Sequence, residues 1–322
     1  MSISILGVGS ALPKRVLTND DLSRMVDTSD EWIRTRTGIS ERHIMMEESV
    51  TSMALDAARL AMEDAGVTAD EIDFVLCPTL GGDYLTPSLA CMVQAGIGAE
   101  CPAMDMNAAC SGFIYSLHIA SALLGTGAYR RILVVSSEGL SRFTDWNDRG
   151  TAVLFGDGAG AAVLGPGDDL KYMYLSAHGN EVPLHAVFTQ GIFPERQPGL
   201  PEPDGMFFRM DGQEVYKFAV NAITTGITTA LDTCGLKPDD VGHVFLHQAN
   251  MRIIDAARKK LDIPQERYAI NIDKVGNISA ATIPVLLHWW HRDGLLKKGE
   301  ILVLSGFGGG FTTGTCVVRW NR

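Results

Sequence analysis

Gly66–Leu76 reads GVTADEIDFVL and places a helix-ending glycine, an acidic turn and an apolar strand in one short run. The same order returns 169 residues later in Gly235–Phe245, which reads GLKPDDVGHVF. At that offset Arg131–Ser136 (RILVVS) also falls on Glu300–Ser305 (EILVLS), a second pair of buried-strand patterns. Two separated matches at one offset predict that the chain contains an internal duplication.

Each half of this duplication is expected to alternate helices and strands. Ser52–Glu63 and Val220–Thr233 have the apolar period of helices, whereas the short Val, Ile and Leu runs are strand-like. The alternation predicts the α/β class, with parallel strands covered by helices, and two units over residues 1–170 and 171–322. Because ligands bind beyond the carboxyl ends of such strands, we expect the loops that follow the matched strands to converge on one site.

One segment breaks the periodicity. Val182–Phe208 contains five prolines and three glycines, and it opens the second half of the chain. Such a composition is typical of an irregular insertion. We expect a surface loop or a loop that lines a substrate channel.

The composition limits the classes of partner. The chain has 322 residues, 46% of them hydrophobic, and a formal net charge of -11, which opposes a general affinity for nucleic acid. No apolar run reaches the roughly 18 residues of a membrane-spanning helix, and Met1–Ser10 lacks the basic start of a signal peptide. The six cysteines are scattered without a CxxC pair, as in proteins of reducing compartments. We therefore expect a cytoplasmic protein without nucleic-acid or membrane partners.

Cys110 is the candidate nucleophile. It follows a strand and a turn of small residues, Ala103–Ala109, and precedes a largely apolar helix that begins near Ser111. The positive end of a helix dipole favours thiolate, the species that attacks carbonyl carbon. On this basis the attack is expected to need no neighbouring base. The other five cysteines are interpreted as small packing residues.

Two further polar residues follow matched elements of the second half. His247 ends the strand pattern Val241–Leu246, and Asn277 lies in a small-residue turn that the offset sets within two residues of the Cys110 turn. A histidine in this place can serve catalysis or only bond a backbone carbonyl, and an asparagine can be only a helix cap. Because both residues are related to the Cys110 region by the duplication, we interpret His247 and Asn277 as catalytic.

A glycine-rich loop follows the last matched strand. Ser305–Phe311 contains three successive glycines, which let the backbone approach a ligand closely. An N–H group of this loop could serve an oxyanion hole beside the amide of Cys110. A phosphate loop would have similar glycines, but the chain contains no GxxxxGK[ST] motif.

Together these motifs resemble the β-ketoacyl-acyl-carrier-protein synthases III of the thiolase superfamily. The likeness covers nearly the whole chain and is carried by Asp30–Ile39, Asn107–Gly112, Arg149–Thr151, Phe155–Gly160, His247–Asn250, Gly276–Asn277 and Phe307–Phe311. The resemblance implies a homodimer of thiolase-like subunits with mixed sheets in five α-β-α-β-α layers. It also implies that an acyl-CoA primer acylates Cys110, and that malonyl-acyl-carrier protein is then decarboxylated and condensed with the acyl group to initiate fatty acid biosynthesis.

The resemblance assigns roles to individual residues. His247 and Asn277 would hold the malonyl thioester carbonyl during decarboxylation, and Cys110 with Gly309 would supply oxyanion N–H groups. Binding of coenzyme A and the carrier is implied for Trp32, Arg36, Thr37, Arg149, Gln213, Asn250, Arg252 and Lys259. Because two hydrogen-bond donors stabilise the enolate that decarboxylation leaves, neither a metal nor an organic cofactor is expected.

Three positions refine the expectation. Thr86 stands where relatives often have an aromatic residue that enters the partner subunit's acyl pocket, so a longer or branched primer is expected. Gln213 stands where relatives often have asparagine. Phe307 stands where thiolases that deprotonate acetyl thioesters have a second cysteine, which favours decarboxylative condensation.

A basic cluster interrupts the acidic background. The predicted helix near Met251 has Arg252 and Lys259 seven residues apart on one face, with Arg258 and Lys260 alongside. Such a cluster can dock an acidic carrier protein, although an ordinary solvated face has the same composition.

Other functions remain open at this level. Within the same fold they are a specialised ketosynthase or an acyltransferase of polyketide or other secondary metabolism. Of a different class are a cysteine hydrolase, which would yield free acid, and a non-catalytic thiolase-fold partner. Such a partner would not need to keep a thiol, an imidazole and an amide in register.

Overall fold

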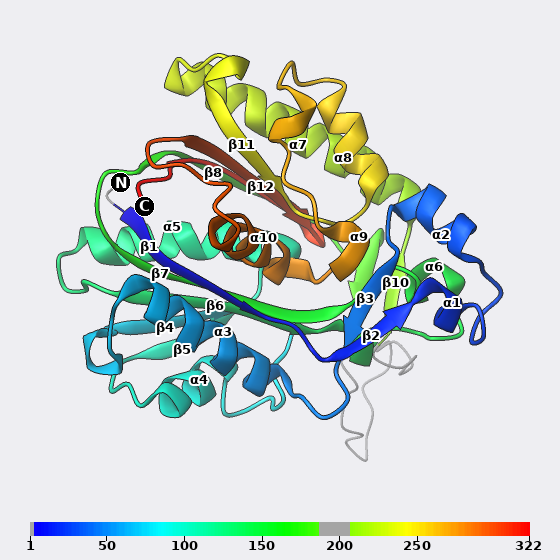
Figure 1. Ribbon diagram of the computed structural model, residues 1–322, viewed down its shortest axis with the longest axis horizontal. Coiled ribbons are helices and arrows are strands. Elements are labelled where there is room, and N and C mark those ends of the chain that lie inside the picture. The colour runs from blue at the N-terminus through cyan, green and yellow to red at the C-terminus, as the bar shows by residue number, and fades with distance from the viewer. Residues whose placement is uncertain (1–2, 187–206) are drawn as a thin grey trace.

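The computed structural model describes residues 3–186 and 207–322 and shows five stacked layers (Figure 1). Two sheets form the second and fourth layers. The first has the order β1 (Ile3–Ala11), β7 (Asp157–Pro166), β6 (Ile132–Gly139), β4 (Phe74–Pro78), β5 (Ala103–Met106). The second has the order β11 (Val241–Leu246), β12 (Ile301–Gly308), β13 (Gly310–Arg319), β8 (Leu170–Asn180).

Both sheets are mixed rather than wholly parallel. β4 is parallel to β5 and β6, and β11 is parallel to β12, whereas β7 and β13 run antiparallel to their neighbours. The parallel pairs are the strands that the sequence pattern identified. β7 is the next strand after β6 and β13 the next after β12, as antiparallel neighbours can be.

Helices form the other three layers. The first sheet is covered outside by α3 (Val50–Ala65) and α4 (Leu89–Ile97), and the second by α7 (Gly212–Cys234) and α8 (Met251–Arg258) (Figure 1). Between the sheets lie α5 (Gly112–Gly125) and α10 (Thr282–Arg292). The predicted five-layered thiolase-like fold is confirmed.

The packing of α3 shows how the sequence permits close layers. Its alanines Ala57 and Ala61 are fully buried and face β1, where a Cβ atom added to Gly7 would lie 2.2 Å from the Ala61 carbonyl oxygen. Ser49 caps the start of the helix through the N–H of Ser52, and Gly66 ends it in the left-handed region at φ 66°.

The structure contains the predicted repeat. The series α3, β4, α5, β6, β7 of the first half corresponds to α7, β11, α10, β12, β13 of the second. Gly66 and Gly235 end equivalent helices at φ 66° and 64°, and the short helices η1 (Ala69–Glu71) and η4 (Pro238–Asp240) follow them. α7 is longer than predicted because Asp211 accepts hydrogen bonds from the N–H groups of Gln213 and Glu214 and starts the helix early.

The two halves share a core. Leu117 of α5 packs in one buried cluster with Leu286 of α10, Leu76 of β4 and Leu304 of β12. The boundary proposed between residues 170 and 171 therefore stays a prediction, because apolar burial is continuous across it.

Smaller elements gather at one end of the layers, on the right in Figure 1. They include the pairs β2 (Arg15–Thr18) with β3 (Glu41–Ile44) and β9 (Leu184–Ala186) with β10 (Phe208–Met210), and α1 (Asn19–Leu22), α2 (Asp30–Thr37), α6 (Arg149–Ala152) and α9 (Ile272–Val275). The remaining short helices are η2 (Ala109–Ser111), η3 (Leu140–Phe143), η5 (Gln265–Arg267) and η6 (Ser279–Ala281). Most of the predicted irregular insertion, residues 187–206, lies outside the described residues, and its flanks form β9 and β10.

Candidate active site

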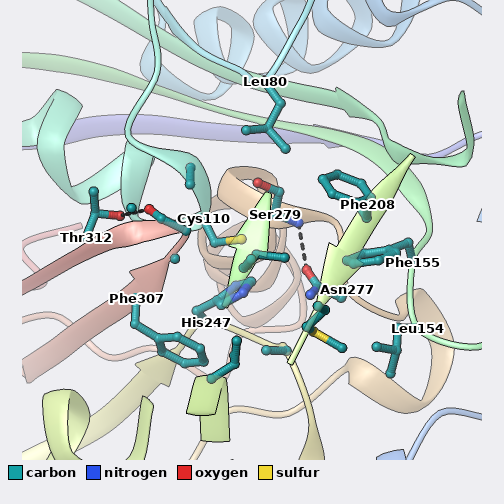
Figure 2. Close-up of a pocket in the computed structure, with 18 of the residues that line it drawn as sticks. Leu80, Cys110, Leu154, Phe155, Phe208, His247, Asn277, Ser279, Phe307 and Thr312 are labelled. Carbon is teal, nitrogen blue, oxygen red and sulfur yellow. Dashed lines mark hydrogen bonds between the residues drawn. The ribbon is translucent and has the colours of Figure 1, made fainter. Parts of the chain in front are cut away.

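Three segments that are distant in sequence converge on one cavity of about 490 Å³. Cys110 comes from η2, His247 from the loop after β11, and Asn277 from the turn between α9 and η6 (Figure 2). Gly308 and Gly309 complete the same wall. The loops after the matched strands β11 and β12 therefore meet the turns of Cys110 and Asn277 at one cavity.

The turns that carry Cys110 and Asn277 have the same geometry. Asn107 accepts a hydrogen bond from the N–H of Ala109 at 3.0 Å, and Asn277 accepts one from the N–H of Ser279 at 2.9 Å. Ala109 and Ser279 both occupy the left-handed region, at φ 47° and 49°. The equivalence of Asn107 and Asn277 was missed in the sequence, although the 169-residue offset sets the two turns within two residues of each other. Such strained turns hold a backbone in one place only where the surroundings enforce it.

The amide group of Asn277 has a determined orientation. A backbone N–H can only donate, so the Asn277 atom that faces Ser279 is the side-chain oxygen. The Asn277 backbone is also fixed, with its N–H donating to Leu154 and its carbonyl accepting from Gly156. Within residues 3–186 and 207–322 neither Nδ2 hydrogen is used in a hydrogen bond, so both can serve as donors on the cavity wall.

His247 is a neutral imidazole in this setting. It is 1% exposed, and burial lowers its pKa to about 3. Its Nδ1 lies 2.8 Å from Oγ1 of Thr282, and its ring packs edge-on against Phe307 with 5.2 Å between centroids.

The thiol of Cys110 is neutral as well, which corrects the expectation of a helix-stabilised thiolate. Burial, with a smaller contribution from the charge of Glu138, raises its pKa from 9.0 to about 12, although the Ser279 hydroxyl acts in the opposite direction. A rise of this size corresponds to roughly 4 kcal/mol, whereas a helix terminus contributes about 0.3–2 kcal/mol. The attack of this thiol therefore needs an acceptor for its proton.

Glycine is required at one position of the loop beside Cys110. A Cβ atom at Gly308 would lie 2.5 Å from the backbone nitrogen of Cys110, whereas at Gly309 the nearest atom, an oxygen of Leu184, is 3.6 Å away. Gly308→Ala should therefore lower the free energy of unfolding by about 1–3 kcal/mol through overpacking. Gly309→Ala is the matched control and should change it little. Urea denaturation of both variants is the measurement, and equal stabilities would contradict the close approach.

Sequence reasoning also missed Glu138, a buried carboxyl near the end of β6. It is 1% exposed, and its Oε2 accepts from the N–H of Leu80 at 3.1 Å. Burial raises its pKa from 4.5 to about 8. The available signal was a carboxylate near the carboxyl end of a matched apolar strand.

The raised pKa of Glu138 predicts a pH-dependent stability. Below pH 4.5 the Glu138 carboxyl is protonated in both the folded and the unfolded chain. Between pH 4.5 and 8 it is protonated only in the folded chain, so the free energy of unfolding falls as the pH rises through this range. Glu138→Gln removes this dependence. The difference in free energy of unfolding, Glu138→Gln minus wild type, should therefore grow by a few kcal/mol between about pH 5 and about pH 8. Glu63→Gln, the same change at an exposed residue, should show no such trend in urea denaturation.

Trp32 and Arg36 of α2 and Arg149 of α6 are expected to bind coenzyme A. They lie at the end of the layers where the smaller elements gather. Two guanidinium groups lie over the Trp32 ring, with Arg36 at 4.5 Å and Arg149 at 4.7 Å from its centroid. α2 packs on α8, because a Cβ atom on Gly38 would lie 2.5 Å from Cβ of Met251. This contact brings the helix of Trp32 and Arg36 beside the helix of Arg252.

The other implied binding residues differ in accessibility. Thr37 is 4% exposed, and its hydroxyl donates to the Ile33 carbonyl and accepts from the N–H of Ile39, so little of it can reach a ligand. Asn250 lines the cavity and caps α8 through the N–H of Arg252. Gln213 is exposed in the first turn of α7, beside the cavity-lining Gly212. Their binding roles stay predictions.

The basic cluster is smaller than the sequence suggested. α8 ends at Arg258, which bonds Asp255 at 3.2 Å and lies over the Tyr268 ring at 5.0 Å. Arg258 therefore stabilises the helix end, a correction to its expected place in the docking face. Arg252, Lys259 and Lys260 are exposed.

The wall of the cavity is mostly apolar. Phe208 packs against Phe155 and Phe143 with centroid distances of 4.7 and 5.9 Å, and Leu140 lies beside them. These residues carried no chemical signal in the sequence. Thr86 is exposed next to Leu85, which is 93% exposed, and does not line this cavity.

None of the helices among the described residues is long and apolar enough to cross a membrane. Within the described ranges, no three His, Cys, Asp or Glu side chains are grouped to hold a metal ion.

Comparisons with known proteins agree with this geometry. Residues 104–180 match the family described as 3-oxoacyl-[acyl-carrier-protein (ACP)] synthase III, and residues 231–320 match its C-terminal part. The chain is 43% identical to β-ketoacyl-[acyl-carrier-protein] synthase III of Clostridium acetobutylicum, over 100% of this chain and 99% of the relative.

Solved structures give the same result. The chain is similar to 3-oxoacyl-[acyl-carrier-protein] synthase III of Aquifex aeolicus VF5, with a TM-score of 0.91 and 42% identity over 98% of this chain and 99% of the other. It is also similar to the priming β-ketosynthase of the R1128 polyketide pathway, with a TM-score of 0.93 and 33% identity over 100% of this chain and 97% of the other.

Proposed function

Because the chain belongs to the 3-oxoacyl-[acyl-carrier-protein] synthase III family, we propose that it condenses an acyl-CoA primer with malonyl-acyl-carrier protein to initiate fatty acid synthesis. The observation that carries this function is the convergence of Cys110, His247 and Asn277 on one largely apolar cavity. The nucleophile Cys110 and the amide donor of Asn277 line a cavity that can hold an acyl chain.

The first half-reaction transfers the primer to Cys110. The thiol loses its proton, its sulfur attacks the thioester carbonyl, and coenzyme A leaves. Backbone N–H groups of Cys110 and Gly309 are proposed to stabilise the tetrahedral oxyanion. The close packing of Gly308 against the backbone nitrogen of Cys110 supports this placement of the two N–H groups.

The second half-reaction needs donors rather than a nucleophile. When the malonyl thioester loses carbon dioxide, its carbonyl oxygen gains the charge of an enolate. The free Nδ2 hydrogens of Asn277 support a role at this oxygen, with the imidazole of His247 beside it. The enolate carbon then attacks the acyl group on Cys110.

The proposed chemistry includes no metal and no organic cofactor, since coenzyme A enters as part of the substrate. Phe307 stands against His247 where a second thiol would be needed for proton abstraction from an acetyl thioester. This position supports decarboxylation as the source of the enolate.

The polyketide alternative shares the fold but has weaker support. The priming β-ketosynthase is superimposed as well as the Aquifex aeolicus protein, yet its identity is 33% against 42%. Product analysis with different carriers separates the two pathways.

A homodimer and a cytoplasmic location are further parts of the proposal. The exposed apolar side chains Tyr84 and Leu85 beside Thr86 support a subunit contact, in which Thr86 would reach the partner's cavity and leave room for a longer primer. The six cysteines, all free in the structure, support a reducing compartment. Sedimentation should give about twice the chain mass of 34.8 kDa, and a monomer would contradict the proposed use of Thr86.

The carrier is proposed to dock on the exposed basic residues at α8, namely Arg252 in its first turn and Lys259 and Lys260 just after its end. Lys259→Glu should slow discharge of acyl-enzyme by malonyl-carrier about tenfold at low salt and weaken its salt dependence. Acylation by acyl-CoA should stay near wild type. Lys298→Glu changes the same charge at an exposed residue of another turn and is the control. Equal losses in both half-reactions would contradict a specific docking role.

The proposal is tested by following both half-reactions on one sample. Labelled acyl-CoA alone should place one acyl group on Cys110, identified by peptide mass spectrometry. Malonyl-carrier should then remove the label as β-ketoacyl-carrier with release of carbon dioxide. Free acid as the product would identify a hydrolase, and release without a carrier would identify another acyltransferase.

A further inference from the structure

The environment of His247 determines which of its nitrogens carries the hydrogen. Nδ1 lies 2.8 Å from Oγ1 of Thr282, and the same hydroxyl lies 2.9 Å from the carbonyl oxygen of Ser279. Thr282 is 1% exposed, so no bulk water replaces either bond. A carbonyl oxygen only accepts, so the single hydroxyl hydrogen of Thr282 is used by Ser279.

Both hydrogen bonds are satisfied in one arrangement alone. Thr282 donates to Ser279 and accepts from Nδ1–H of His247, which leaves Nε2 of the neutral imidazole without a hydrogen. Nε2 makes no hydrogen bond to a described residue, and His247 lines the cavity with Cys110 (Figure 2).

We propose that Thr282 is a positioning residue that holds His247 as the Nδ1–H tautomer, so that Nε2 accepts the proton of Cys110. This inference rests on the proposed function. During acylation the S–H bond of Cys110 breaks and its proton moves to Nε2, while sulfur bonds to the acyl carbon. The C–S bond to coenzyme A then breaks, and Nε2 returns the proton to the departing sulfur. Atoms and charge balance without another reactant.

A hydroxyl partner also suits the second half-reaction better than a carbonyl would. Thr282 can rotate its hydrogen from Ser279 toward Nδ1 once Nδ1 has given its hydrogen to solvent and Nε2 has taken one from solvent through the cavity. His247 then donates Nε2–H to the enolate oxygen. A carbonyl at this place could only accept and would fix the first tautomer. Condensation releases Cys110 as a thiolate. This thiolate takes up one proton from solvent, which is the one proton that the overall reaction consumes.

The tautomer is measured directly by ¹⁵N NMR of histidine-labelled protein, with the His247 signals identified by their loss in His247→Ala. The wild type should show a protonated Nδ1 and a bare Nε2. Thr282→Val removes the acceptor while keeping a similar shape, and a measurable fraction of the hydrogen should move to Nε2. Thr282→Ser restores the hydroxyl and should restore the wild-type pattern.

Activity provides the second readout. Thr282→Val should lower the rate of acylation on the order of 10²-fold, since a catalytic imidazole in the wrong tautomer loses its base. Carbon dioxide release from malonyl-carrier should change far less, and Thr282→Ser should acylate within about threefold of wild type.

A bare Nδ1 in the wild type overturns the proposal, whatever the variants do. So does a Thr282→Val protein that retains the wild-type tautomer and loses both half-reactions by the same factor, because that pattern indicates a packing role. Should Thr282→Val fail to fold, the wild-type spectrum still decides. If wild type used neither thioester, the proposed function would fail while the NMR result still stood.

Discussion

Cys110→Ala is expected to form no acyl-enzyme from acyl-CoA and yet to continue releasing carbon dioxide from malonyl-carrier. Acylation needs the sulfur as a nucleophile, whereas decarboxylation needs only donors at the carbonyl oxygen. The donors of Asn277 are held by bonds to Ser279, Leu154 and Gly156, none of which involves Cys110. The overall condensation should fall below detection.

The measurement pairs label retained on the protein with carbon dioxide evolved. Cys91→Ala, which removes an exposed thiol from α4, is the control and should behave as wild type in both. If folded Cys110→Ala also lost carbon dioxide release, the two half-reactions would share the thiol, and the proposed separation would be wrong.

His247→Ala and Asn277→Ala are expected to differ, although both residues line the same cavity. The pKa of Cys110, raised to about 12 by burial, makes an acceptor for its proton necessary. His247→Ala should therefore slow acylation about 10²- to 10⁴-fold, as loss of a general base does, and should slow decarboxylation as well. Asn277→Ala should slow decarboxylation about 10²- to 10³-fold while acylation stays within about fivefold of wild type.

The contrast is read from single-turnover rates with each thioester alone. Circular dichroism and thermal denaturation confirm that both variants fold. Equal acylation by His247→Ala and wild type would mean that another group takes the proton of Cys110. An acylation defect in Asn277→Ala as large as that of His247→Ala would mean that the turn near Ser279 had lost its shape.

Much of the site could be predicted because its residues follow regular elements. Cys110, His247 and Asn277 each stand just past a strand or in a turn before a helix, and the duplication identified those places without any distance. The parallel strands β4 with β6 and β11 with β12 carry their loops to one edge by geometry alone. The glycine loop was recognisable for the same reason.

Protonation states could not be predicted in the same way. A helix N-terminus is visible in the sequence, but the burial that outweighs it at Cys110 comes from packing of η2 against β12 and η6. Glu138 and Thr282 are ordinary residues of a strand and a helix in the sequence. Only the approach of distant segments leaves Glu138 with a pKa of about 8 and gives Thr282 an imidazole as its neighbour.

The sequence by itself determined the duplicated α/β architecture and the three reactive residue types, because helix period, strand pattern and turn composition are local properties of the chain. The tertiary structure alone decided which charges survive in the cavity, which nitrogen of His247 meets Thr282, and which apolar side chains shape the wall. The physical reason is that desolvation and hydrogen-bond partnership depend on residues brought together from both halves of the chain, and no local pattern encodes their distances.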